Sequence, residues 1–79
     1  MTPREALQLL RSVWGGGSNL SAKQAEQLAS CAQEGETSLA TCARLAGVDV
    51  SGVKAFDTAH IYALCSRREA EMDLARARQ

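Results

Sequence analysis

The sequence contains few of the residues that mark most classes of protein. Its 79 residues include one proline, one histidine, three aromatic residues and three cysteines, and its formal net charge is zero. The cysteines are far apart and form no C-x-x-C, so the clustered ligands of a structural zinc site are missing. A neutral chain is also poorly suited to binding nucleic acid through a broad basic surface. Without a long apolar run or a signal-peptide core, the sequence predicts a cytoplasmic protein that does not span a membrane.

What the chain does contain is alanine and short aliphatic side chains, which bring its apolar fraction to 46%. This fraction is typical of a folded domain, and the length predicts one small domain over residues 1–79. Because large side chains are scarce, we expect a core built from close helix contacts. A second copy of the chain, or a partner, would complete such a core.

Two segments begin with complete helix-start signals. Thr2 precedes Pro3, and Glu5 stands three residues after Thr2, as a capping box requires. Ser21 and Gln24 repeat the arrangement before a second segment. The first helix places an apolar stripe inward (Ala6, Leu7, Leu10, Val13 and Trp14), and the second a smaller one (Ala25, Leu28, Ala29 and Ala32).

Two further helices are predicted in the second half of the chain. The third is short and ends at Gly47, where a left-handed cap belongs. The fourth runs from about Val50 towards the C-terminus, with Asp49 or Ser51 as its cap, and the helical spacing of Val53, Phe56 and Ile61 predicts that Phe56 is buried. No segment alternates with a period of two. The sequence therefore predicts an all-α domain of four helices, with a helix-turn-helix-like centre and a long C-terminal helix.

The centre of the chain carries small and aliphatic residues at characteristic offsets: Ala43, Gly47, Val48 and Val53. In this respect it resembles the helix-turn-helix superfamily of phage repressors and bacterial regulators. The resemblance covers the region from Leu20 to about Thr58, and its strongest part spans 20 residues. It implies two helices that cross closely at Ala43 and a tight turn at Gly47.

If the resemblance extends to function, the chain binds duplex DNA and controls transcription, with Arg44 clamping a phosphate. The residues at the start of the second helix would face the major groove (Asp49, Ser51, Lys54, Ala55 and Thr58), and we select Ser51, Lys54 and Thr58 as DNA contacts. The long final helix would join two copies into a dimer. This surface holds one lysine, has acids beside it and lacks the Arg, Asn and Gln side chains of bidentate base recognition.

A second hypothesis is therefore open, in which the chain is an adaptor or inhibitor that docks on a larger protein. Trp14, beside a run of three glycines, is a candidate anchor, as are Arg67 and Arg68, because Trp and Arg dominate interface hot spots. We expect no enzyme activity, cofactor or metal, since no motif with a catalytic mechanism is present. His60 is expected at the edge of the core.

Overall fold

The computed structural model describes residues 1–54 and 56–78, which form four α-helices and no strand. The helices are α1 (Pro3–Val13), α2 (Ala22–Cys31), α3 (Ser38–Ala46) and α4 (Thr58–Ala77). The all-α prediction and the long C-terminal helix are thereby confirmed. Of the helices in these two ranges, none is both apolar and long enough to cross a bilayer.

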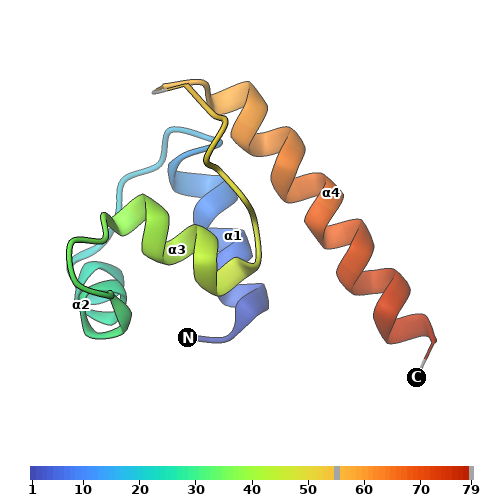
Figure 1. Ribbon diagram of the computed structural model, residues 1–79, viewed down its shortest axis with the longest axis horizontal. Coiled ribbons are helices and arrows are strands. Elements are labelled where there is room, and N and C mark those ends of the chain that lie inside the picture. Colours follow the sequence, from blue (N-terminus) through green and yellow to red (C-terminus); the bar gives the residue numbers. More distant parts are fainter. Residues whose placement is uncertain (55, 79) are drawn as a thin grey trace.

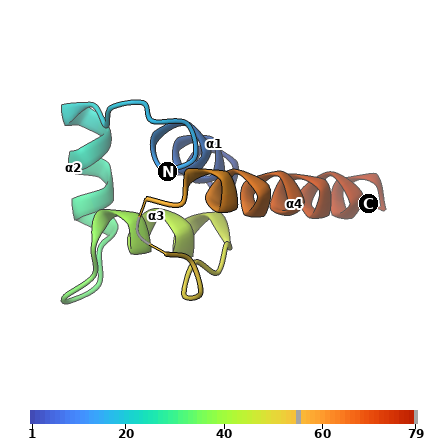
Figure 2. The same ribbon diagram turned by 90° about the horizontal axis from the view of Figure 1, so that it is seen from above.

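Helix α1 lies at the centre of the fold and packs against both α3 and α4 (Figure 1). Helix α2 contacts α3 and lies at the end of the molecule opposite the free end of α4 (Figure 2). The contacts of α4 with α1 and α3 extend as far as Asp73, and its last turn reaches beyond them (Figure 2). The fold is thus a small core around α1, from which the C-terminal end of α4 extends.

The helix starts follow the sequence signals closely. Thr2 accepts a hydrogen bond from the Glu5 amide at 3.1 Å, and the Glu5 carboxylate accepts one from the Thr2 amide at 3.1 Å. Ser21 and Gln24 form the same reciprocal pair at the start of α2. Each box satisfies two backbone donors that a helix start leaves unpaired. Both predicted capping boxes are confirmed.

The core is built largely from small side chains around three leucines. Leu7 and Leu10 from α1 and Leu28 from α2 are fully buried, and the other fully enclosed positions are Ala, Cys and Thr residues of α1, α3 and α4. The stripe predicted for α2 is narrower than expected, because Ala29 and Ala32 are exposed. Since α2 touches the rest of the molecule on one side only, a single leucine is enough to fix it.

The predicted start of the last helix is wrong by about eight residues. Helix α4 begins at Thr58, and its N-cap is Asp57, whose carboxylate accepts from the His60 amide at 3.0 Å. Residues 48–54, 56 and 57 instead belong to the loop that connects α3 to α4. Asp49 accepts from the Ser51 amide at 2.9 Å, an Asx turn that competes with helix formation at the place where the valine spacing predicted it.

Ionic contacts fasten the long helix α4 to α1. Arg11 pairs with Glu69, and its guanidinium lies 6.0 Å from the ring centroid of Tyr62. Near the other end of α1, Arg4 meets Asp73 at 3.1 Å. The hydrogen bond to the Glu69 carboxylate raises the pKa of Arg11 above its ordinary value. These pairs lie outside the apolar contact of Ile61 and Cys65 with the core and orient the helix along α1.

Candidate partner-binding surface

Trp14 is positioned at the end of α1 by the turn that follows it. It caps the helix, and its amide donates to the carbonyl of Leu10 at 3.1 Å. Gly15 then lets the chain pass close to α4, since a Cβ there would lie 2.7 Å from the Arg11 oxygen and 3.2 Å from the Tyr62 nitrogen. The Trp14 side chain is partly buried and packs on the core.

The loop between α3 and α4 is anchored at its start by Val48 and at its end by the Asp57 cap, and it carries an exposed aromatic ring just before that cap. Val48 is buried, Val50 and Val53 are partly buried, and the Val53 amide donates to the Val50 carbonyl at 3.0 Å. Phe56 follows, and its side chain is 98% exposed. The prediction that Phe56 lies in the core is therefore wrong. Phe56 precedes α4, which begins at Thr58, and so it does not lie on the buried face of a helix.

Phe56 combines two features that are individually unfavourable. Its backbone φ is 67°, and it is the only residue other than glycine with a positive φ among the described parts of the chain. A left-handed conformation costs a residue with a Cβ roughly 1–2 kcal/mol. The exposed ring recovers nothing through burial in the fold. The Phe56 carbonyl accepts from the Thr58 amide at 3.0 Å, but its ring is left exposed.

A cavity of about 420 Å³ lies beside Phe56. Its walls come from the end of α1, the start of α3, the loop and the first turn of α4. Most of the lining side chains are apolar (Val13, Trp14, Leu39, Val50, Val53, Phe56 and Ile61, with Gly17, Lys54 and Thr58). Lys54 is the one charged residue of this lining. We call the cavity and its rim, from Trp14 to Phe56, the Trp14–Phe56 surface.

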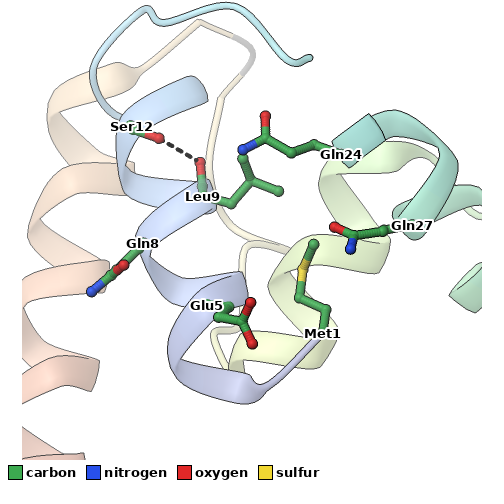
Figure 3. Close-up of a pocket in the computed structure, with 7 residues that line it drawn as sticks. All are labelled: Met1, Glu5, Gln8, Leu9, Ser12, Gln24 and Gln27. Carbon is green, nitrogen blue, oxygen red and sulfur yellow. Dashed lines mark hydrogen bonds between the residues drawn. The ribbon is translucent and has the colours of Figure 1, made fainter. Parts of the chain in front are cut away.

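A second hollow of about 430 Å³ lies between α1 and α2. Figure 3 shows its lining, in which Glu5, Gln8, Gln24, Gln27 and Ser12 accompany Met1 and Leu9. Two of the polar groups are already engaged in capping boxes, and Ser12 donates to the Leu9 carbonyl at 3.3 Å. Its polar walls favour water, whereas the Trp14–Phe56 surface favours hydrocarbon.

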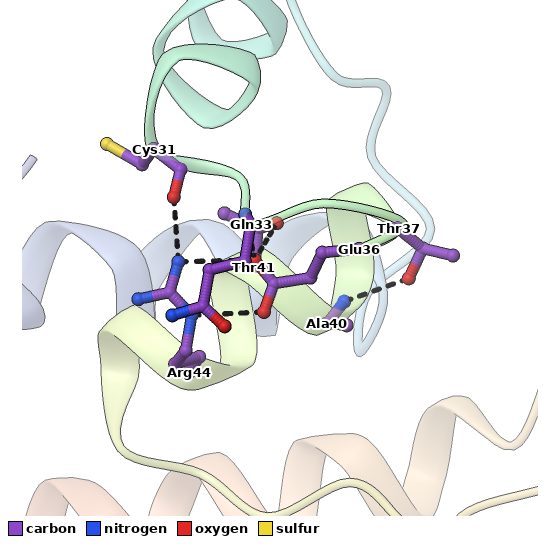
Figure 4. A network of polar contacts seen from close by, with 7 residues as sticks. All are labelled: Cys31, Gln33, Glu36, Thr37, Ala40, Thr41 and Arg44. Atoms are coloured by element: carbon purple, nitrogen blue, oxygen red, sulfur yellow. Dashed lines mark hydrogen bonds and ion pairs between the residues drawn. The ribbon is translucent and has the colours of Figure 1, made fainter.

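Arg44, predicted as a phosphate clamp, is held within the chain. Its guanidinium bonds Glu36 at 3.0 and 3.2 Å and the Cys31 carbonyl at 2.7 Å (Figure 4). Glu36 also accepts from the buried Thr41 hydroxyl at 2.8 Å and from the Gln33 amide. The Arg44 guanidinium, with these other donors, lowers the pKa of Glu36 from 4.5 to about 2. The network joins the end of α2 to α3.

The other predicted DNA contacts are not presented by one helix. Ser51 and Lys54 lie in the loop, and Thr58 is the first residue of α4. Ala55 lies outside the described residues. The predicted turn is present, since Gly47 has a φ of 73° and caps α3, but the residues after it do not continue as a helix.

Arg67 and Arg68, predicted as partner contacts, have different surroundings. Arg68 donates to the Ala46 carbonyl at 3.0 Å and pairs with Glu71 at 3.2 Å, so it links α4 to the end of α3. Arg67 is exposed. The structure does not bring either of them to Trp14, which lies on another face of the fold among the residues of the cavity.

The thiols and the histidine form no reactive group in the described part of the chain. Cys42 and Cys65 are fully buried, and burial raises the pKa of the Cys42 thiol to about 11. His60 is exposed rather than at the core edge, because it points away from the α1 contact of α4. Over residues 1–54 and 56–78, no group of three potential metal ligands is found.

The sequence pointed to Trp14 as a partner contact and to Lys54 and Thr58 as DNA contacts, but not to the apolar residues that join them on this surface. Phe56 was taken for a core residue, and the valines for one face of a helix. A usable signal was present in Asp57 and Thr58, both good N-cap residues, which mark a later helix start. Comparison with known protein families, curated protein sequences and solved structures yields no match to this chain.

Proposed function

We propose that the chain is a protein-binding adaptor or inhibitor that docks on a larger protein through the Trp14–Phe56 surface. The observation that carries the proposal is Phe56, a fully exposed aromatic residue in a left-handed conformation. Strained residues that pack against nothing are characteristic of binding sites, where a partner supplies the missing contacts. Aromatic anchors also dominate the energetics of interfaces.

The surroundings of Phe56 support the same proposal. Trp14, Val50 and Val53 lie together beside it and are each partly exposed. An apolar group of this kind, rimmed by polar residues, is typical of an interaction site. The fold contributes a rigid base, since the loop is fixed at Val48 and at the Asp57 cap.

Binding to duplex DNA stays a prediction, as does a dimer formed through α4. The turn at Gly47 agrees with the helix-turn-helix resemblance. The arrangement of Ser51 and Lys54 in a loop, with Arg44 paired to Glu36, offers no continuous helix for the major groove. Enrichment of a symmetric site from a randomised duplex pool, with affinity falling as salt rises, would favour the regulator over the adaptor.

The test of the docking function compares two exposed hydrophobic residues. Immobilised wild-type chain, Phe56→Asn and Leu74→Ser are exposed to extract of the source cells, and each retained protein is then purified and titrated against all three. Leu74 is the matched control because it is 54% exposed but lies on the free part of α4.

We expect a partner whose affinity falls about tenfold or more with Phe56→Asn and is unchanged with Leu74→Ser, as removal of a hot-spot residue predicts. If every retained protein binds the wild type and Phe56→Asn equally, the docking function is wrong.

A further inference from the structure

The cavity of the Trp14–Phe56 surface differs from the other large hollow in chemistry rather than in size. The two have volumes of about 420 and 430 Å³. Five of the seven residues that line the α1–α2 hollow are polar, and the other two are Met1 and Leu9. Seven of the ten that line the cavity beside Phe56 are aliphatic or aromatic, and the other three are Gly17, Lys54 and Thr58. A hollow lined in this way gains stability when an apolar group replaces the water within it.

The charge in the lining of this cavity is positive. Lys54 is its only charged lining residue, and it has no ion-pair partner among the described residues. The neighbouring acid, Asp57, is not part of the lining and is occupied with the His60 amide at the start of α4. An apolar occupant that also carries a carboxylate would therefore meet a complementary charge at the rim.

The extent of the surface limits the form of the occupant. It consists of one cavity and a few rim residues, well short of the 20 to 30 residues per side of a standard interface between folded proteins. A short extended segment, with one side chain inserted, matches such a surface. Peptide segments of this kind bind through a few pockets.

We propose that the cavity receives an aromatic or branched aliphatic side chain from a segment of the partner protein, and that Lys54 binds an acidic residue next to it. The inserted side chain packs on Trp14, Val50 and Val53, while Phe56 closes over it from the rim. The inference rests on the proposed function and names the part of the partner that is recognised.

The probes are three blocked dipeptides: acetyl-phenylalanyl-glutamate amide and its glutamine and lysine counterparts. Trp14, the only tryptophan of the chain, lines the cavity and reports binding through its fluorescence. We expect a saturable change in emission with millimolar dissociation constants, as befits so small a ligand. The glutamate peptide should bind two- to fivefold more tightly than the glutamine peptide, roughly the effect of one exposed ion pair, and the lysine peptide should bind least.

Two variants and one control variant locate the binding. Lys54→Gln should remove the preference for glutamate and leave the affinity for the glutamine peptide unchanged, while Lys23→Gln, on α2, should change neither. Val53→Asp should abolish binding of all three peptides, with an unchanged helical circular dichroism spectrum as proof of folding.

The absence of any saturable change would overturn the inference, and equal affinity for all three peptides would overturn its acidic part. Binding of 3-phenylpropionate without binding of the peptides would assign the cavity to a small carboxylate and overturn the peptide segment. The docking function is tested separately, by the loss of partner affinity in Phe56→Asn. A negative peptide titration would not change the outcome of that test.

Discussion

Gly47 and Phe56, nine positions apart, share a left-handed backbone conformation but differ in side chain and in surroundings. Gly47 has a φ of 73° and Phe56 a φ of 67°. Gly47 ends α3, its amide bonds the Arg44 carbonyl at 3.1 Å, and the Arg68 guanidinium lies against it. Phe56 carries a large side chain that is almost completely exposed. The first is a position where the sequence agrees with the fold, and the second is one where it does not.

The difference separates the structural role of Gly47 from the binding role that we propose for Phe56. At Gly47 the left-handed conformation costs little, since glycine adopts it freely, and it satisfies the end of a helix. At Phe56 the same conformation is strained, and the aromatic ring gains no burial in return. Because local rules are broken chiefly at functional sites, the comparison supports the proposal that Phe56 takes part in binding.

The largest effect should come from Gly47→Ala. The added Cβ would lie 2.9 Å from Nη2 and 3.0 Å from Nε of Arg68, in addition to the left-handed strain. We expect the free energy of unfolding to fall by about 2 kcal/mol in urea titration. If the close contact contributes, Gly47→Ala should cost less in an Arg68→Ala background, and strict additivity of the two changes would show that it does not.

A smaller effect is expected from acid on the α2–α3 side of the molecule. Because the folded-state pKa of Glu36 lies at about 2, below its ordinary 4.5, this group contributes its full stability above pH 4.5. The contribution is lost as the pH falls from 4.5 through 2. Glu36→Gln should flatten the pH dependence of unfolding in this window, measured by urea titration. An unchanged pH profile would contradict the role of the Arg44–Glu36 pair.

The smallest effect is expected at the rim of the cavity. Lys54 is exposed and has no ion-pair partner within the described chain, so Lys54→Gln should change the free energy of unfolding by less than about 0.5 kcal/mol. The same change should alter peptide selectivity. Thermal unfolding followed by circular dichroism measures the first quantity, and a clear loss of stability would assign Lys54 to the fold and weaken the contrast with Gly47.

The local parts of the fold could be predicted from the sequence. The two capping boxes and the glycine cap of α3 depend on residues close together in the chain, and each appears in the structure. The start of α4 could not be predicted in the same way. The spacing of Val50 and Val53 fits a helix, but the Asx turn at Asp49 and the cap at Asp57 decide the backbone.

The candidate site was less predictable because it belongs to no single segment. Trp14 and Leu39 are 25 residues apart, and both line the cavity with the loop and with Ile61. Only the packing of α3 and α4 on α1 brings them together. Arg44 illustrates the same limit, since its pairing with Glu36 depends on the fold of the α2–α3 connection. Whether a given side chain is exposed or paired cannot be derived from its residue type alone.

The most direct test of the contrast between Gly47 and Phe56 is the free energy of unfolding of Phe56→Asn. Asparagine tolerates the left-handed conformation and removes the aromatic ring. If Phe56 serves binding, the variant should be as stable as the wild type or more stable by up to about 1 kcal/mol in urea titration. A loss of 1 kcal/mol or more would show that the ring is buried in the fold, and the account of Phe56 as a docking residue would be wrong.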